Sequence, residues 1–221
     1  MSAGTGVAPS FTWRVAGVTA EPMATVPTLR LSVEIGTAPG ADGPVRVHCL
    51  VLSVSVRIAA ALRDYDPDTR GRLRAVFGTD GQWADSLGDL VWARPTVVVP
   101  GFTGGTTVDV PVPCGQDLDL ASASYLHAVL DGDVPLRLLF GGTVFHARDG
   151  RLATAQLPAD SEAHHRMPAA RWHELRERYF GGHRWLRLDR ETHDRLHDYR
   201  VRQACPSPQA AIEELLTKYG T

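Results

Sequence analysis

Alternation of apolar and polar side chains defines the first predicted strands of this chain. Between Thr28 and Ile35, leucine, valine and isoleucine occupy every second position, with polar residues between them. A period of two is typical of a β-strand with one buried face. Phe11–Val18 begins with the same alternation and is predicted as a second strand, and the proline-containing segment 21–27 is predicted as the loop between the two.

The segment Val45–Ile58 is apolar on both of its faces. One apolar set ends with Cys49 and Val51, while a second set of opposite parity begins at Leu50. The buried face therefore changes side near residues 49–52. Such a change indicates either a β-bulge or a strand that passes from the environment of one sheet to that of another.

Further strands are expected on both sides of a glycine-rich turn, Gly101–Gly105. They cover Val91–Val99, Thr106–Val112, Val134–Phe140 and Arg151–Leu157. The prolines of the first two strands lack the N–H that a ladder requires, so we expect these strands at sheet edges or with irregular geometry. Because a strand follows Gly105, and not a helix, the glycines predict a hairpin and not a phosphate-binding loop.

Helical signals interrupt the strands twice and then fill the C-terminal part of the chain. Asp66-Pro67 predicts the start of one helix and Gly78 its end, and Leu118–Leu130 is predicted as a second helix with Asp117 as its cap. After a polar linker that contains His164 and His165, three more helices are expected to begin at Pro168, Asp189 and Ser207.

These elements predict a mainly β fold with added helices. The expected architecture is an antiparallel β-sandwich of about seven strands, with two short inserted helices and a C-terminal helical tail. We expect a flexible N-terminus over residues 1–10, a sandwich domain over 11–158 and a helical tail over 159–221 that packs on the sandwich. A partly open sheet with helices on one face, as in SecB export chaperones, is the alternative.

Composition narrows the class of protein. A net charge of -2 over 221 residues disfavours an electrostatic nucleic-acid binder, which needs a basic face. The longest apolar run, Cys49–Leu62, contains Arg57 and is too short to span a bilayer, and the first residues do not resemble a secretion signal. Three widely separated cysteines favour neither a disulfide framework nor a thiolate metal site. We therefore expect a cytoplasmic protein without membrane insertion.

Six of the nine histidines lie in the predicted tail. His193 and His197 stand four residues apart on a predicted helix, a spacing at which two imidazoles share a metal ion. His173 and His183 have no fixed placement relative to this pair, no HExxH carboxylate accompanies it, and neighbouring arginines repel a cation. A solvated helix face is the favoured interpretation, and His193 and His197 stay the candidate metal ligands of the alternative.

Cys114 lies near His127 in the sequence, which suggests a cysteine–histidine nucleophile pair oriented by Asp117 or Asp119. Free cysteine is more often a small buried hydrophobe, however, and the chain contains no GxSxG elbow. We therefore assign no catalytic residue and expect no cofactor.

Two aromatic residues are candidates for a partner-binding surface. Most large aromatics fill cores. Trp83 and Phe102 lie in turn-rich segments where no periodicity directs them inward, so they are the candidate partner-binding residues, although burial is the favoured interpretation for these two as well.

The sequence resembles an uncharacterised actinobacterial family whose members are encoded near NiFe-hydrogenase genes. Two stretches carry the resemblance, WADSLGDLVWARPTVVVPGFTGGTTVDVPVPC and YLHAVLDGDVPLRLLFGGTVF. The resemblance covers nearly the whole chain, includes Trp185-Leu186-Arg187-Leu188 in the tail and excludes the histidine-rich segment 164–173. The resemblance implies a genomic setting near hydrogenase genes, but it identifies no catalytic or ligand residue. The favoured function is a non-catalytic accessory protein whose partner is a hydrogenase subunit or maturation protein. A small-ligand or metal carrier that uses the histidine-rich tail and an enzyme of unknown reaction are the alternatives.

Overall fold

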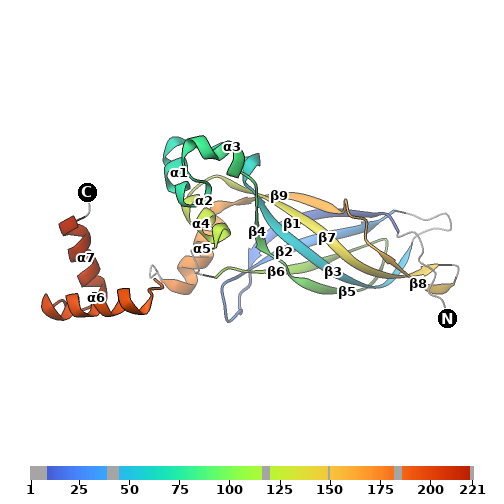
Figure 1. Cartoon of the computed structure of the whole chain (residues 1–221). Coiled ribbons are helices and arrows are strands. Elements are labelled where there is room, and N and C mark those ends of the chain that lie inside the picture. Colours follow the sequence, from blue (N-terminus) through green and yellow to red (C-terminus); the bar gives the residue numbers. More distant parts are fainter. Residues whose placement is uncertain (1–8, 39–44, 116–119, 149, 182–185, 220–221) are drawn as a thin grey trace. The chain divides into compact units, whose positions relative to one another are not determined.

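A computed structural model describes residues 9–38, 45–115, 120–148, 150–181 and 186–219 (Figure 1). The chain divides into two compact units, residues 1–182 and 183–221. Most of the expected flexible N-terminus, residues 1–8, lies outside the described residues.

The first unit is a β-sandwich of two antiparallel sheets, as predicted. Its described residues form nine strands: β1 Phe11–Ala20, β2 Thr28–Thr37, β3 Arg46–Ala59, β4 Asp89–Ala93, β5 Thr96–Thr103, β6 Gly105–Pro113, β7 Asp133–Arg148, β8 Arg151–Gln156 and β9 Glu162–Pro168. One sheet has the order β1-β2-β6, and the six other strands form the second sheet around β3 and β7.

Short strands share the two edges of the six-stranded sheet. β5 and β4 pair with successive parts of β3, and β8 and β9 pair with different halves of β7. The partner of β7 changes near Gly142, whose φ is +139° and where a Cβ would lie 2.0 Å from the Val51 carbonyl oxygen, so only glycine fits. Because β4 and β5 share one edge position and β8 and β9 share the other, the six-stranded sheet is four strands wide, and the other sheet is three strands wide. The nine strands therefore occupy the seven positions that were expected.

The core lies between the two sheets. The alternating residues of β2 that predicted a buried face, Leu29, Leu31, Val33 and Ile35, are each at most 1% exposed. They pack against inward residues of the six-stranded sheet such as Leu50 and Leu52 in one continuous cluster. Burial of each such side chain contributes roughly 1.5 to 3 kcal/mol.

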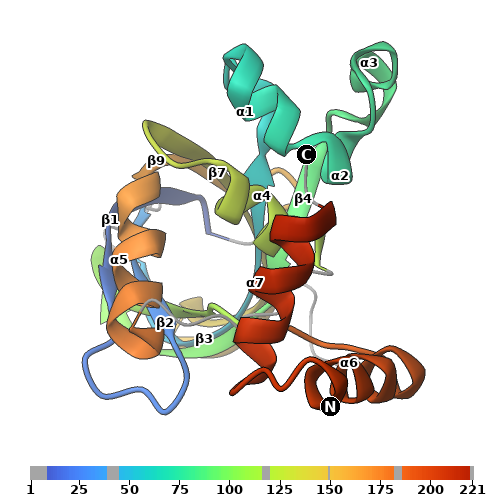
Figure 2. The same cartoon turned by 90° about the vertical axis from the view of Figure 1, so that its left-hand side faces the viewer.

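Helices gather at one end of the sandwich, opposite the end at which β8 lies (Figure 1). They are α1 Pro67–Arg72, α2 Arg74–Phe77, α3 Trp83–Ser86, α4 Ala121–Ala128 and α5 Ala169–Phe180. The predicted cap of the first inserted helix is confirmed, since the Thr69 N–H donates to Asp66 Oδ1 at 2.8 Å. The predicted second cap, Asp117, lies outside the described residues. Trp172 and Leu175 of α5 complete the core next to β1 and β2 (Figure 2).

The polar linker predicted around His164 and His165 is wrong, because this segment forms strand β9. Its register places Leu136 opposite His165 on the edge of β7. Ala163, His165 and Met167 are the inward set, with Ala163 and Met167 buried. The period of two was present in the sequence, but a histidine in its middle position concealed it.

The hairpin predicted around Gly101–Gly105 is a turn between sheets and not a paired hairpin. β5 pairs with β3, whereas β6 pairs with β2 in the opposite sheet. Gly104, with φ +76°, makes the turn. The strand expected over residues 91–99 is likewise divided into β4 and β5 at Pro95, and both β5 and β6 are edge strands, as their prolines predicted.

The second unit contains α6 Arg190–Arg202 and α7 Pro208–Tyr219. Both predicted starts are confirmed: Asp189 Oδ1 accepts a hydrogen bond from the Thr192 N–H at 2.7 Å, and Ser207 Oγ accepts one from the Ala210 N–H at 3.1 Å. The expected packing of residues 183–221 on the sandwich stays a prediction. Within the described part of the chain, no helix is both long enough and apolar enough to cross a membrane.

Candidate functional site: the outer face of the six-stranded sheet

Trp83 is buried, which is the interpretation favoured from the sequence over exposure at a partner-binding surface. The side chain is 8% exposed, and its ring packs edge-on against Tyr65 and Phe77 at centroid distances of 5.4 Å. Its Nε1 donates to the Gly78 carbonyl oxygen at 3.3 Å. Tertiary packing of the inserted helices thus buries an aromatic side chain that no local periodicity directed inward, and Trp83 contributes to the core.

Phe102 is half-buried near the end of β5. It lies opposite Val47 in the ladder and packs partly against the core, beside the exposed Gly101 and Thr103. With Arg46 and His48 it lines a shallow hollow. The role of Phe102 in partner binding stays a prediction.

Cys114 is 2% exposed and hydrogen-bonded to the Val112 carbonyl oxygen at 3.3 Å. Burial raises the pKa of its thiol to about 12, so the thiolate needed for nucleophilic attack is scarce at neutral pH. His127 lies on α4 with an exposed side chain, and Asp117 and Asp119 lie outside the described residues. The structure therefore gives no support to a nucleophile pair.

The described histidines of the predicted tail fall on three separate elements, β9, α5 and α6. His193 and His197 are exposed on α6, four residues apart on a helix as predicted, and His193 Nδ1 lies 3.3 Å from Asp194 Oδ1. His173 lies on α5, and His183 is outside the described range. Among the described residues, no group of three or more His, Cys, Asp or Glu side chains is arranged to hold a metal ion. Metal binding by His193 and His197 stays an alternative prediction.

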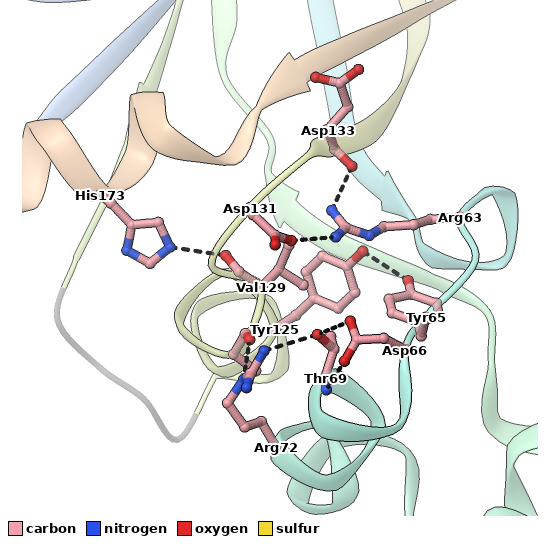
Figure 3. Close-up of polar contacts among 11 residues, drawn as sticks. Arg63, Tyr65, Asp66, Thr69, Arg72, Tyr125, Val129, Asp131, Asp133 and His173 are labelled. Atoms are coloured by element: carbon pink, nitrogen blue, oxygen red, sulfur yellow. Dashed lines mark hydrogen bonds and ion pairs between the residues drawn. The ribbon is translucent and has the colours of Figure 1, made fainter.

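A polar cluster joins the helices to the end of the sandwich (Figure 3). The Tyr65 and Tyr125 hydroxyls are 2.8 Å apart inside it, and Tyr65 also donates to the Ala60 carbonyl oxygen at 2.7 Å. Burial raises the pKa of both tyrosines, so neither hydroxyl is a base at neutral pH. These groups are suited to holding α4 against the segment before α1 and not to proton transfer.

The remaining side chains of this cluster hold backbone groups (Figure 3). Arg72 Nε donates to the Ala128 carbonyl oxygen at 2.8 Å and Arg63 Nη1 to that of Asp133 at 2.8 Å. His173 Nε2 lies 2.9 Å from the Val129 carbonyl oxygen and ties α5 to the end of α4. These side chains bond to backbone carbonyl groups at the end of α4 and at the start of β7, which is a structural role.

An apolar surface lies on the outer face of the six-stranded sheet, and it begins with a bulge in β3. The register of β3 shifts between Val47 and Cys49 against β7, as the two-faced sequence pattern indicated. Beyond the bulge, Leu50 and Leu52 point inward and are fully buried, so Cys49 and Val51 point outward.

Neighbouring strands extend this surface, because residues opposite each other in an antiparallel ladder share a face. Val51 lies opposite Val98, and Cys49 lies between Pro100 of β5 and Phe145 of β7. Leu152 of β8 lies on the same face opposite Ala147, diagonal to Phe145, whose direct partner in β8 is Thr154. Val98 and Leu152 are 65% and 66% exposed. We call this set the outer patch: Cys49, Val51, Val98, Pro100, Phe145 and Leu152.

Charged residues lie farther along the same face, about six residues, or roughly 20 Å, beyond Val51, with Ser53 and Ser55 between. Arg137 of β7 donates from Nε to Glu162 Oε2 at 2.9 Å and lies 3.5 Å from Asp89 Oδ2. His164 Nε2 lies 3.4 Å from the other oxygen of Glu162. The hydrogen bond from Arg137 and then that from His164 lower the pKa of Glu162.

Sequence reasoning missed the outer patch, although part of its signal was visible. The outward parity of Cys49 and Val51 was read as a change of the buried face, and the structure shows that this parity is the solvent side. Val98, Phe145 and Leu152 come from three other strands, and only the ladder register brings them together.

Comparisons with known proteins give a family and no activity. The model of DUF6084, a family of unknown function, matches residues 8–221. No curated protein matches the chain in sequence.

Several solved structures are distantly similar. A beta-glucosidase from Kluyveromyces marxianus is 10% identical with a TM-score of 0.24, over 72% of this chain and 15% of that one. Beta-glucosidase 3B from Thermotoga neapolitana is 14% identical with a TM-score of 0.27, over 72% and 17%. A putative late embryogenesis abundant (LEA) protein is 14% identical with a TM-score of 0.30, over 74% of each chain. This chain therefore spans less than a fifth of each glucosidase, and similarities this weak indicate no function.

Proposed function

Because this chain belongs to DUF6084, a family of unknown function, we propose its role from its own surface: it is a non-catalytic accessory protein that binds another protein through the outer patch. The observation that carries the proposal is the group of outward apolar side chains on β5, β3, β7 and β8 that forms the outer patch. Contiguous exposed apolar surface of this kind marks interaction sites on soluble proteins.

A non-catalytic role is supported by how the reactive side chains are used. The Cys114 thiol is buried with a raised pKa. Tyr65 and Tyr125 bond to each other, and the arginines beside them hold backbone carbonyl groups. These groups are engaged in keeping the fold together, which leaves the surface as the place of function.

The partner we propose is a component of a NiFe-hydrogenase system, either a subunit or a maturation protein. This identity rests on the family resemblance of the sequence and on its implied actinobacterial setting. The outer patch adds one requirement, namely that the partner presents a matching apolar surface.

Co-purification with a tagged full-length chain tests this function. The bait is expressed in an actinobacterial host under hydrogenase-producing conditions, and each captured protein is identified and then tested for direct binding in purified form. Val98→Glu introduces a charge into the centre of the outer patch and should weaken binding about thirtyfold, which corresponds to about 2 kcal/mol at a central interface residue.

Val26→Glu is the matched control, because Val26 is 53% exposed but lies in the loop between β1 and β2. It should leave binding unchanged. A purified partner that binds Val98→Glu as tightly as the parent chain contradicts the proposed surface. Capture that depends on Val98 but contains no hydrogenase component contradicts the proposed partner.

A further inference from the structure

The helices of the second unit leave most of their apolar surface unburied. Among the described residues 186–219, only Ala211 is buried. Leu216 and Tyr219 of α7 are 63% and 72% exposed. Helices of 12 and 13 residues are marginal in water unless packing stabilises them, so this unit gains stability from whatever covers its apolar side chains.

A groove of about 510 Å³ lies within this unit. Its volume falls within the range of sites that receive large apolar groups. Two hydrogen bonds tie α6 and the following turn to α7, from Tyr199 Oη to Glu214 Oε1 at 3.0 Å and from Cys205 Sγ to Glu214 Oε2 at 3.2 Å, and they fix the spacing of its walls. The apolar side chains that line it are Leu186, Leu188, Leu196, Tyr199, Ile212 and Leu215.

The rim of the groove is predominantly basic. Arg195 and Arg202 line it together with one acidic residue, Asp198. Both arginines are exposed, and neither forms an ion pair with another residue in the described part of the chain. They lie seven residues apart on α6, which is two helical turns, or about 10.5 Å along the axis.

We propose that this groove binds an acidic amphipathic helix of a partner protein. Apolar anchors at positions i, i+3 or i+4 and i+7 are the side chains that a groove between two helices receives. Two carboxylates spaced i and i+7 on the bound helix match the spacing of Arg195 and Arg202, so the rim selects acidic helices over basic ones. This site is independent of the outer patch and does not rest on the function proposed for it.

Fluorescence anisotropy with the full-length chain tests the proposal. The probe is a labelled 18-residue helical peptide with leucines on one face and glutamates at i and i+7 beside them. A second peptide carries lysine at the two glutamate positions, and a third has the first peptide's composition in scrambled order. The acidic amphipathic peptide should bind with an affinity that falls as salt is added, and the two other peptides should bind at least about tenfold more weakly.

Variants then locate the bound peptide. Arg202→Glu should weaken binding of the acidic peptide about tenfold, whereas Arg190→Glu, on the same helix but away from the groove lining, should not change it. Leu196→Glu should abolish binding, and circular dichroism at 222 nm verifies that each variant keeps its helices.

Three outcomes overturn the proposal. They are no binding of the acidic peptide, equal binding of the lysine peptide, and binding that Arg202→Glu leaves unchanged. Sedimentation of the full-length chain identifies another occupant, since a dimer that dissociates on Ile212→Glu would assign the groove to a second copy and contradict a partner helix.

Discussion

The two outer faces of the sandwich differ in composition although they belong to one fold. On the three-stranded sheet, Arg14 pairs with Glu34, Arg30 pairs with both Glu21 and Asp109, and Ser32 Oγ donates to Asp109 Oδ1 at 2.7 Å. On the six-stranded sheet, the corresponding outward positions carry the outer patch.

This difference shows that the fold requires apolar side chains on the inner face of each sheet but not on the outer face. Both sheets bury an alternating apolar set against the same core, so the inner faces alone satisfy the sandwich. The three-stranded sheet shows that this chain can place ionic side chains on a solvent-facing sheet. The apolar outer patch is therefore not a by-product of the architecture, and the binding function that we propose would account for it.

The largest contrast we predict is between neighbouring residues of β3 that point to opposite faces. Leu52→Ala removes a fully buried side chain and should lower the free energy of unfolding by about 2 to 5 kcal/mol. Val51→Ala, at an outward position, should change it by less than about 0.5 kcal/mol. Urea unfolding measures both values, and a Val51→Ala cost as large as that of Leu52→Ala would show that the outer face is packed against something.

The two cysteines of the sandwich should differ in thiol reactivity. Cys49 is half-exposed in the outer patch, whereas Cys114 is buried and its raised pKa of about 12 leaves about one thiol in ten thousand ionised at pH 8. Iodoacetamide followed by mass spectrometry should find Cys49 modified at least about a hundredfold faster than Cys114 in the folded chain. Equal rates would contradict the assignment of Cys49 to the solvent side, and denaturant should abolish the difference.

A smaller effect is expected at the ionic cluster of Arg137, Glu162 and His164, which lies on the same face as the outer patch but farther along the strands. Arg137 and His164 lower the pKa of Glu162, so their interaction stabilises the folded chain above the ordinary glutamate pKa and is lost as pH falls through the lowered value. Glu162→Gln should therefore melt below the parent chain at pH 7, and the difference should shrink below about pH 4.5. Glu174→Gln, in an exposed pair on α5, is the control and should show little dependence on pH. A Glu162→Gln difference that stays constant down to pH 3 would be the contrary result.

Local sequence signals predicted the elements that depend on local chemistry. The alternation of β2 and the caps at Asp66 and Asp189 were read correctly because one strand face or one helix end determines them. Strand β9 was missed, since His165 occupies an inward position. The burial of Trp83 has no local periodic signal in the sequence, because contacts with residues distant in sequence cause it.

The candidate site could be predicted only in part for the same reason. The apolar parity of Cys49 and Val51 is local, but their union with Phe145 depends on the register between β3 and β7. Whether a sheet face is covered or open depends on where the helices pack, and here α5 packs near the three-stranded sheet. Periodicity identifies two faces of a strand, and only the tertiary structure identifies the one that meets solvent.

Footprinting on both faces tests the central claim most directly. Single cysteines are placed at Val98, in the outer patch, and at Thr107, an exposed position on the polar face, and their alkylation rates are measured with and without the purified partner. We predict that the partner slows alkylation of Val98→Cys at least about tenfold and leaves Thr107→Cys unchanged, because a bound protein excludes reagent from the surface that it covers. Protection of Thr107→Cys alone, or of neither position at saturating partner, would contradict a docking function of the outer patch.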